Sequence, residues 1–250
     1  MKLQQLKQKL ILWQLTQAQK EQGLTLTECI VAIVVLSAVI VSMTPPIFLA
    51  VATRAQNKKA EQALQLAHGE IDKIRVLIER GEYQEPELPP NAGTNTTVDN
   101  VTPPQSVYYN GSIIQSTNYY CSKYDQQGAP QLKVTEALLV DINGDCKPDF
   151  LVQTFRVNQI LKPGTNIPMI FTMGVRVYST AAANFDATGK NFISIKPNLS
   201  TKEASLQLST GEGDQTTKPL SVLTVNIAQA DNQNSLTKYC QFLNNGNTCP

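Results

Sequence analysis

The chain has 250 residues, with 21 basic and 20 acidic side chains and a net charge of +1 at pH 7. This length allows one large domain or two small ones. The balanced charge gives no basic surface of the kind that binds nucleic acid, so we expect no nucleic-acid partner. With His68 as the only histidine, metal sites built from several imidazoles are excluded.

The first 53 residues contain a cationic leader and an uncharged run. Residues 1–23 carry four lysines and one acid, and residues 29–53 are 25 residues without a charge. A transmembrane helix needs about 20 such residues, so we expect one membrane span within residues 24–53. Lysines before a span keep that end in the cytoplasm, which predicts a single-pass inner-membrane protein with everything after Arg54 outside the cytoplasm.

The glycine of this region, Gly23, precedes the uncharged run. In a secretory signal peptide the cleavage site follows the apolar stretch, behind small residues. A lipoprotein signal that used Cys29 would need a small residue where Glu28 stands. We therefore expect neither kind of signal, and we interpret Cys29 as a small buried apolar residue.

The hexapeptide GLTLTE, residues 23–28, resembles the N-terminal signature of the type IV prepilin family. That signature is a glycine, a hydrophobic residue, Thr, Leu, any residue and Glu, followed by an apolar helix. Leu24 stands where Phe is usual, and Thr27 stands where Ile, Leu or Val is usual. The resemblance implies cleavage between Gly23 and Leu24 by a prepilin peptidase, and N-methylation of Leu24.

A carboxylate at the edge of a membrane span is costly and usually has a partner. Cleavage would create a cationic amine at Leu24. The resemblance implies that this amine pairs with Glu28 of a neighbouring subunit in a filament. The alternative is that Glu28 lies at the membrane interface and faces lipid headgroups.

Residues 54–81 predict an amphipathic extension of the same helix. Apolar residues recur there at spacings of three and four, and Gly81 is a reasonable stop. Pro45 and Pro46 predict a kink or a locally broken turn before this extension. The expected stripe, which a downstream sheet would cover, consists of Leu64, Ala67, Ile71, Ile74 and Ile78.

The rest of the chain predicts a linker at 82–106, rich in Pro, Asn and Thr, and a β-rich outer domain at 107–250. Asn110-Gly111 lies between apolar pairs and indicates a hairpin. Further strands are expected at residues 137–140, 150–157, 169–178, 191–195 and 221–228. We therefore expect an α+β fold with the long N-terminal helix packed on an antiparallel sheet, which is also how the globular domains of pilins are built.

The stretch Asp141 to Phe150, DINGDCKPDF, resembles calcium-binding loops. Position 6 is Cys146 instead of Gly and position 12 is Val152 instead of Glu, which leaves a tight Asn-Gly turn between two strands as the alternative. The four cysteines beyond the membrane predict two disulfides with three possible pairings. The candidate calcium ligands are Asp141, Asn143, Asp145, the Lys147 carbonyl and Asp149, and the candidate disulfide cysteines are Cys121, Cys146, Cys240 and Cys249.

No catalytic motif stands out, so we expect a structural protein and not an enzyme. Thr44 to Ala67 is most similar to cyanobacterial pseudopilins of hormogonium polysaccharide secretion. This resemblance implies a minor pseudopilin of a filament like those of type IV pili and type II secretion, with roles in polysaccharide secretion and gliding motility. Its implied partners are other pilins, the prepilin peptidase, an inner-membrane assembly platform and membrane lipid. The alternatives are a membrane-anchored extracytoplasmic enzyme and a calcium-binding adhesion module.

Overall fold

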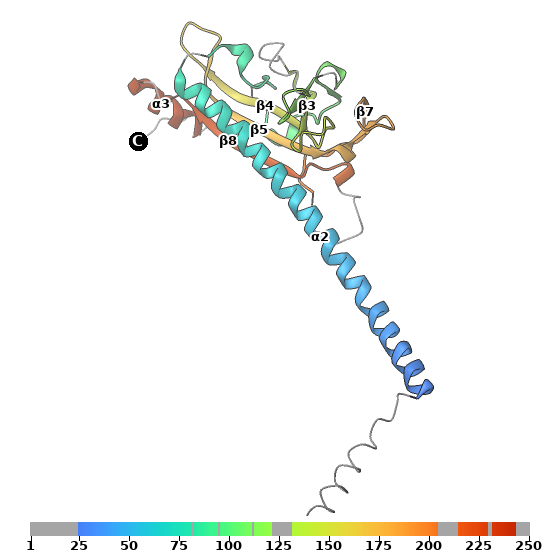
Figure 1. The fold of residues 1–250 in the computed structure, drawn as a ribbon. Coiled ribbons are helices and arrows are strands. Elements are labelled where there is room, and N and C mark those ends of the chain that lie inside the picture. The colour runs from blue at the N-terminus through green and yellow to red at the C-terminus, as the bar shows by residue number, and fades with distance from the viewer. Residues whose placement is uncertain are drawn as a thin grey trace, which may run out of the picture. The chain divides into compact units, whose positions relative to one another are not determined.

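The computed structural model describes residues 25–81, 83–94, 96–111, 113–121, 132–204, 215–229 and 232–243, with the backbone alone at 44–49, 110 and 232–237. The chain divides into two compact units, Met1–Thr53 and Arg54–Pro250. One long helix, α2, belongs to both units (Figure 1).

The helix α2 spans Leu26–Arg80, which is 55 residues. It continues without a break through Pro45 and Pro46, so the broken turn expected there is not found. An interior proline removes a single hydrogen bond of the helix ladder, and the turns on either side keep theirs. The helix ends at the predicted residue, because Gly81 has a φ of +76° and its N–H donates to the Ile78 carbonyl.

The part of α2 beyond Arg54 buries one stripe against the sheet (Figure 1). The expected stripe is confirmed from Ala67 to Ile78. Leu64 does not belong to it: its side chain is 41 % exposed, and Ala63, at 0 %, takes the place in the contact. Ala63 and Ala67 are both fully buried at this end of the stripe, and the larger Leu64 lies one position around the helix and faces outward.

The outer unit contains a mixed sheet whose strand order is β1-β3-β4-β5-β8, with β2 also paired to β3. The order of strands confirms the α+β class. The strands of this sheet are β1 (Ser106–Val107), β2 (Ile114–Ser116), β3 (Glu136–Asp141), β4 (Phe150–Leu161), β5 (Pro168–Ser179) and β8 (Ser221–Ala228). A separate hairpin pairs β6 (Ala183–Phe185) with β7 (Phe192–Ile195), and a second helix, α3, spans Asn232–Leu243.

The sheet is antiparallel from β3 to β8, but β1 and β2 run parallel to β3. The hairpin predicted at Asn110-Gly111 is therefore wrong. Residues Tyr108–Gly111 form a 3₁₀ helix, η3, which connects two short strands that both add to the same edge of β3. The Asn-Gly pair supplies a turn, as the sequence indicated, but the open edge of β3 decides the pairing.

Both faces of the sheet are covered. Side chains alternate between the two faces along each strand. Val152 and Met173 face the α2 stripe, whereas Leu151 and Phe155 face the opposite side. That second face is covered by residues of the 92–107 segment and by the β6–β7 hairpin. The outer unit therefore has apolar contacts on both sides of one sheet.

The described residues of 82–106, where we expected a linker, are packed onto the sheet. The Arg156 N–H donates to the Pro90 carbonyl (2.9 Å), and the Ala92 N–H donates to the Arg156 carbonyl (2.8 Å). The Arg156 guanidinium also forms an ion pair with Glu85. This segment covers part of the β4 edge, which would otherwise present unpaired backbone groups.

A second buried arginine, Arg176 on β5, holds the same segment on the other face of the sheet. Its guanidinium donates to the carbonyls of Val98 (2.6 Å) and Val101 (2.8 Å), and it lies over the Phe155 ring with its central carbon 4.9 Å from the ring centre. Burial lowers the pKa of Arg176. Two carbonyls of a proline-rich segment thus accept hydrogen bonds from a buried guanidinium, a contact that composition alone did not indicate.

Candidate functional site

The predicted processing site lies at the start of the described structure. Gly23 and Leu24 are outside the described residues, and the described chain begins at Thr25. The helix α2 begins at Leu26. Two residues, Leu24 and Thr25, therefore lie between the scissile bond implied by the resemblance and the first helical residue.

Thr25 and Glu28 form a reciprocal cap at the start of α2. The Thr25 N–H and hydroxyl donate to Glu28 Oε2 (2.9 and 3.0 Å), and the Glu28 N–H donates to Thr25 Oγ1 (3.3 Å). This is the capping box of a Ser/Thr followed three residues later by Glu. We had not predicted this role for Glu28, although the T-x-x-E spacing before an apolar run is its sequence signal.

The first part of α2 is apolar on all sides. Leu26–Met43 is 18 residues with a mean hydropathy of 2.5, and none of it is buried within the chain. By length and composition this helix can cross a membrane, a property that it shares with signal sequences. Cys29 is a free thiol in this helix that none of the described residues covers, so its expected burial stays a prediction.

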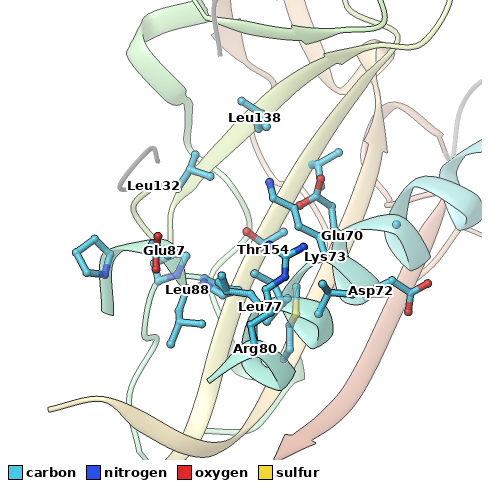
Figure 2. A pocket seen from close by; sticks show the side chains of 18 residues that line it. Glu70, Asp72, Lys73, Leu77, Arg80, Glu87, Leu88, Leu132, Leu138 and Thr154 are labelled. Carbon is cyan, nitrogen blue, oxygen red and sulfur yellow. The ribbon is translucent and has the colours of Figure 1, made fainter. Parts of the chain in front are cut away.

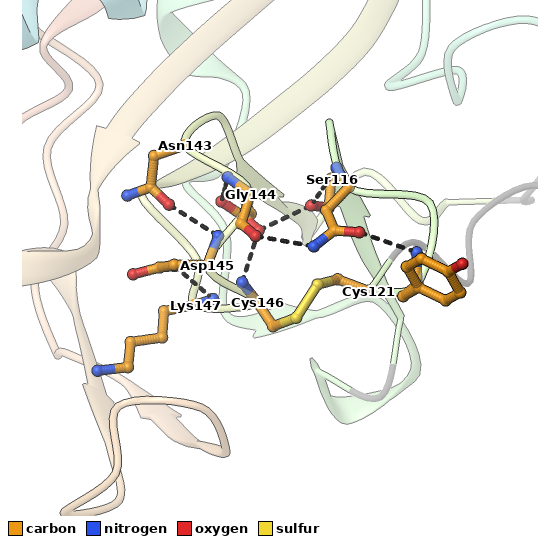
Figure 3. The surroundings of a disulfide bond; sticks show 10 residues. Ser116, Cys121, Asn143, Gly144, Asp145, Cys146 and Lys147 are labelled. Carbon is orange, nitrogen blue, oxygen red and sulfur yellow. Dashed lines mark hydrogen bonds between the residues drawn. A yellow bond between two sulfur atoms is a disulfide. The ribbon is translucent and has the colours of Figure 1, made fainter.

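The loop between β3 and β4 is organised around the carboxylate of Asp141, which is 1 % exposed (Figure 3). Asp141 Oδ1 accepts a hydrogen bond from the Gly144 N–H (2.7 Å). Asp141 Oδ2 accepts from the Cys146 N–H (2.9 Å) and from the Ser116 hydroxyl (2.7 Å). The carboxylate therefore ties the loop to β2 through hydrogen bonds within the chain.

The side-chain oxygens of the other predicted calcium ligands, Asn143, Asp145 and Asp149, also accept backbone hydrogen bonds. Asp149 Oδ2 accepts from the N–H groups of Ile142 and Asn143 (2.9 and 3.3 Å). The side-chain oxygens of Asn143 and Asp145 accept from the N–H groups two residues further on, those of Asp145 and Lys147. Among the described residues, no group of three or more His, Cys, Asp or Glu side chains is placed to hold a metal ion. Calcium binding at this loop stays a prediction.

A disulfide joins Cys121 to Cys146 with 5.2 Å between the Cα atoms, which selects one of the pairings left open by the sequence (Figure 3). It links the end of the β2 segment to the β3–β4 loop. Cys240, within α3, is also disulfide-bonded. Cys249 lies outside the described residues, so the Cys240–Cys249 bond stays a prediction.

Two groups with shifted pKa values serve structural roles. Burial raises the pKa of Tyr178 to about 12, and its hydroxyl donates to the Ser200 carbonyl (2.9 Å). Hydrogen bonds, first from the Thr188 hydroxyl and then from Asn191, lower the pKa of Asp186 in the β6–β7 turn. Each group fixes a loop that we had not singled out from the sequence.

His68, the only histidine of the sequence, is exposed on α2.

No protein-family model matches the chain, and no curated protein and no solved structure matches it. The sequence motifs and the geometry of the described residues are therefore the basis for assigning a function.

Proposed function

We propose that the chain is a minor pseudopilin, a structural subunit of a membrane-based filament of the type IV pilus or type II secretion kind. A prepilin peptidase cleaves it between Gly23 and Leu24, and the processed helix packs with the helices of other subunits. The observation that carries this proposal is the order of features: a lysine-rich leader, the GLTLTE motif, and then a helix without any buried residue from Leu26 to Met43.

The exposure of this helix supports a role in assembly. An apolar helix that is exposed on every side is stable only in lipid or against other apolar helices. A simple anchor needs no carboxylate at its membrane edge, yet Glu28 lies there. Such residues are rare within spans and are usually paired. Pairing with the amine of a neighbouring subunit gives the carboxylate a partner.

The capping box is compatible with this pairing. In the single chain, Glu28 Oε2 accepts both hydrogen bonds from Thr25. The second carboxylate oxygen can still accept a hydrogen bond from an amine. Glu28 would then fix the first turn of its own helix and pair with a neighbouring subunit at the same time. A role in polysaccharide secretion and gliding motility is the finer part of the proposal, and it is supported by the sequence resemblance.

Processing is tested by co-expressing the chain with a prepilin peptidase and measuring the N-terminal mass. The variant Gly23→Trp places a bulky side chain at the scissile glycine, and we expect only full-length precursor from it. Leu24→Phe introduces the residue usual in the family and serves as the matched control, which should be cleaved and N-methylated. A mature form of Gly23→Trp with Leu24 at its N-terminus would contradict the proposal.

A further inference from the structure

A groove of about 760 Å³ lies within the outer unit, between the last turns of α2, the proline-rich residues 86–90 and the sheet (Figure 2). Apolar side chains from all three elements line it, among them Leu77, Leu88, Leu138 and Met173. Ligand sites in proteins have volumes of about 300–1,000 Å³ and mostly apolar linings with a few polar groups. The groove has both properties.

The wall opposite the helix is held in place without a ligand. Arg156 on β4 forms an ion pair with Glu85 and donates a hydrogen bond to the Pro89 carbonyl. The Gln84 N–H donates to the Glu87 carboxylate (2.8 Å). Residues 86–90 are thus fixed at both ends, and a preformed wall lowers the entropic cost of binding.

A glycine lies on the helix wall. Gly69 lines the groove, and a Cβ atom added to it would meet no atom within 4 Å. Glycine is a poor helix former compared with alanine, and neither close packing nor a positive φ requires it at this position. A side chain at this position of the lining would therefore extend into open space.

Opposite charges lie toward the two ends of the helix wall. Glu70 and Arg80 both line the groove, and neither forms an ion pair with another described residue. At 1.5 Å per helical residue they are about 15 Å apart along α2. The lining has three other charged residues: Asp72 is paired with Arg75, Lys73 has an interaction of its own, and the Glu87 carboxylate accepts a hydrogen bond from the Gln84 N–H. A ligand with one sign of charge along its length would therefore be repelled at one end.

We propose that this groove binds an extended peptide segment with a basic residue at one end, an apolar middle and an acidic residue at the other. The first and fifth residues of an extended segment are about 13 Å apart, and their long side chains cover the remaining distance to Glu70 and Arg80. The apolar middle contacts Leu77 and Leu138. The Thr154 hydroxyl, which lies between them in Figure 2, forms a hydrogen bond with the peptide backbone. This inference is independent of the proposed filament role.

Charge reversal tests the polarity of the groove. The probe is a fluorescein-labelled Arg-Leu-Val-Leu-Asp peptide, titrated against the full chain in detergent micelles and followed by fluorescence anisotropy, with empty micelles as the blank. Glu70→Lys and Arg80→Glu should each weaken binding about fivefold to tenfold, as expected for reversed rim charges. Glu70→Lys should instead bind the two-acid peptide Asp-Leu-Val-Leu-Asp more tightly than the original probe. Affinities that both reversals leave unchanged, or binding no stronger than to empty micelles, would overturn the proposal.

A steric test is independent of charge. Gly69→Leu places a bulky side chain in the open space at the groove lining and should reduce the affinity for the probe at least tenfold. Gly69→Ala adds only a Cβ atom, for which there is space, and should leave the affinity unchanged. Urea unfolding of both variants verifies that the outer unit is intact. Equal binding by Gly69→Leu and Gly69→Ala would show that the peptide binds elsewhere and would overturn the proposal.

Discussion

The two halves of α2 differ in what covers their apolar side chains. From Leu26 to Met43 every side chain is exposed, whereas beyond Arg54 the side chains of Ala67 and Ile78 are 0 % and 1 % exposed. In the first half apolar residues occupy all sides of the helix. In the second half they form one stripe, with charged residues on the other sides. One half is covered within the chain, and the other is an apolar helix that none of the described residues covers.

Isoleucine truncation gives the sharpest contrast between the halves. Ile74 is 5 % exposed in the contact with the sheet, and Ile33 is 64 % exposed in the same helix. Ile74→Ala should lower the unfolding free energy of the outer unit by about 2–5 kcal/mol because it leaves a cavity. Ile33→Ala should change it by less than about 0.5 kcal/mol. Urea unfolding in micelles, followed by near-UV circular dichroism, measures both; equal effects would refute the contrast.

The described cysteines also differ between the outer unit and the first half of α2. Cys121 and Cys146 close a loop with a sequence separation of 25, and Cys29 is a free thiol in the first half of α2. Replacing the bonded pair by serines should lower the unfolding free energy of the outer unit by about 3.5 kcal/mol, because the unfolded chain gains conformational freedom. Cys29→Ser is the control and should leave that free energy unchanged. A loss of similar size from both would show that the disulfide is not the cause.

Lysine substitutions distinguish an exposed valine in the first half of α2 from one in the second half. Val34 is 62 % exposed and Val76 is 46 % exposed. In an insertion assay Val34→Lys should raise the apparent free energy of membrane insertion by about 2.5–3.5 kcal/mol. Val76→Lys places the charge in water and should have no effect. Unchanged insertion of Val34→Lys would contradict a membrane environment for the first half.

The outer unit is expected to show a pH effect through Tyr178. The folded-state pKa of Tyr178, about 12, lies above its ordinary value of 10.0. The resulting stabilisation is complete below pH 10 and is lost as the pH rises toward 12. Between pH 9 and pH 11 the unfolding free energy should fall by about 1.4 kcal/mol more in the original chain than in Tyr178→Phe. Tyr178→Phe also loses the hydrogen bond to Ser200, but this loss lowers its unfolding free energy equally at both pH values. It therefore does not contribute to the change between pH 9 and pH 11. Identical pH profiles would refute the assignment.

The sequence predicted most of the helices and strands, but it predicted fewer of the pairings between strands and of the contacts between segments. The second half of α2, its end at Gly81 and the strands β3, β4, β5, β7 and β8 follow from short-range patterns of apolar and turn residues. The pairing of β1 and β2 with β3 does not, because it depends on which strand edge is free in the folded sheet. For the same reason the docking of residues 83–107 required knowledge of where Arg156 and Arg176 lie.

In the candidate site, too, the sequence predicted local features but not contacts between distant segments. The GLTLTE motif and the uncharged run are local features, and they predicted an apolar helix within residues 24–53 that is long enough to cross a membrane. The cap between Thr25 and Glu28 was also encoded locally and was missed only because Glu28 was interpreted through its partner in a filament. The Cys121–Cys146 pairing and the peptide groove join segments that are distant in the chain.

For this chain, the sequence alone determined the two halves of the long helix, since a continuous apolar run and a three-four stripe differ within a few turns. It also determined that the outer region forms β-strands. Only the tertiary structure decided that Ala63 and not Leu64 contacts the sheet, and that two buried arginines fix the proline-rich segment. Those outcomes depend on which side of the helix meets the sheet and on which carbonyls the folded strands leave unpaired, and neither is a property of a local stretch of sequence.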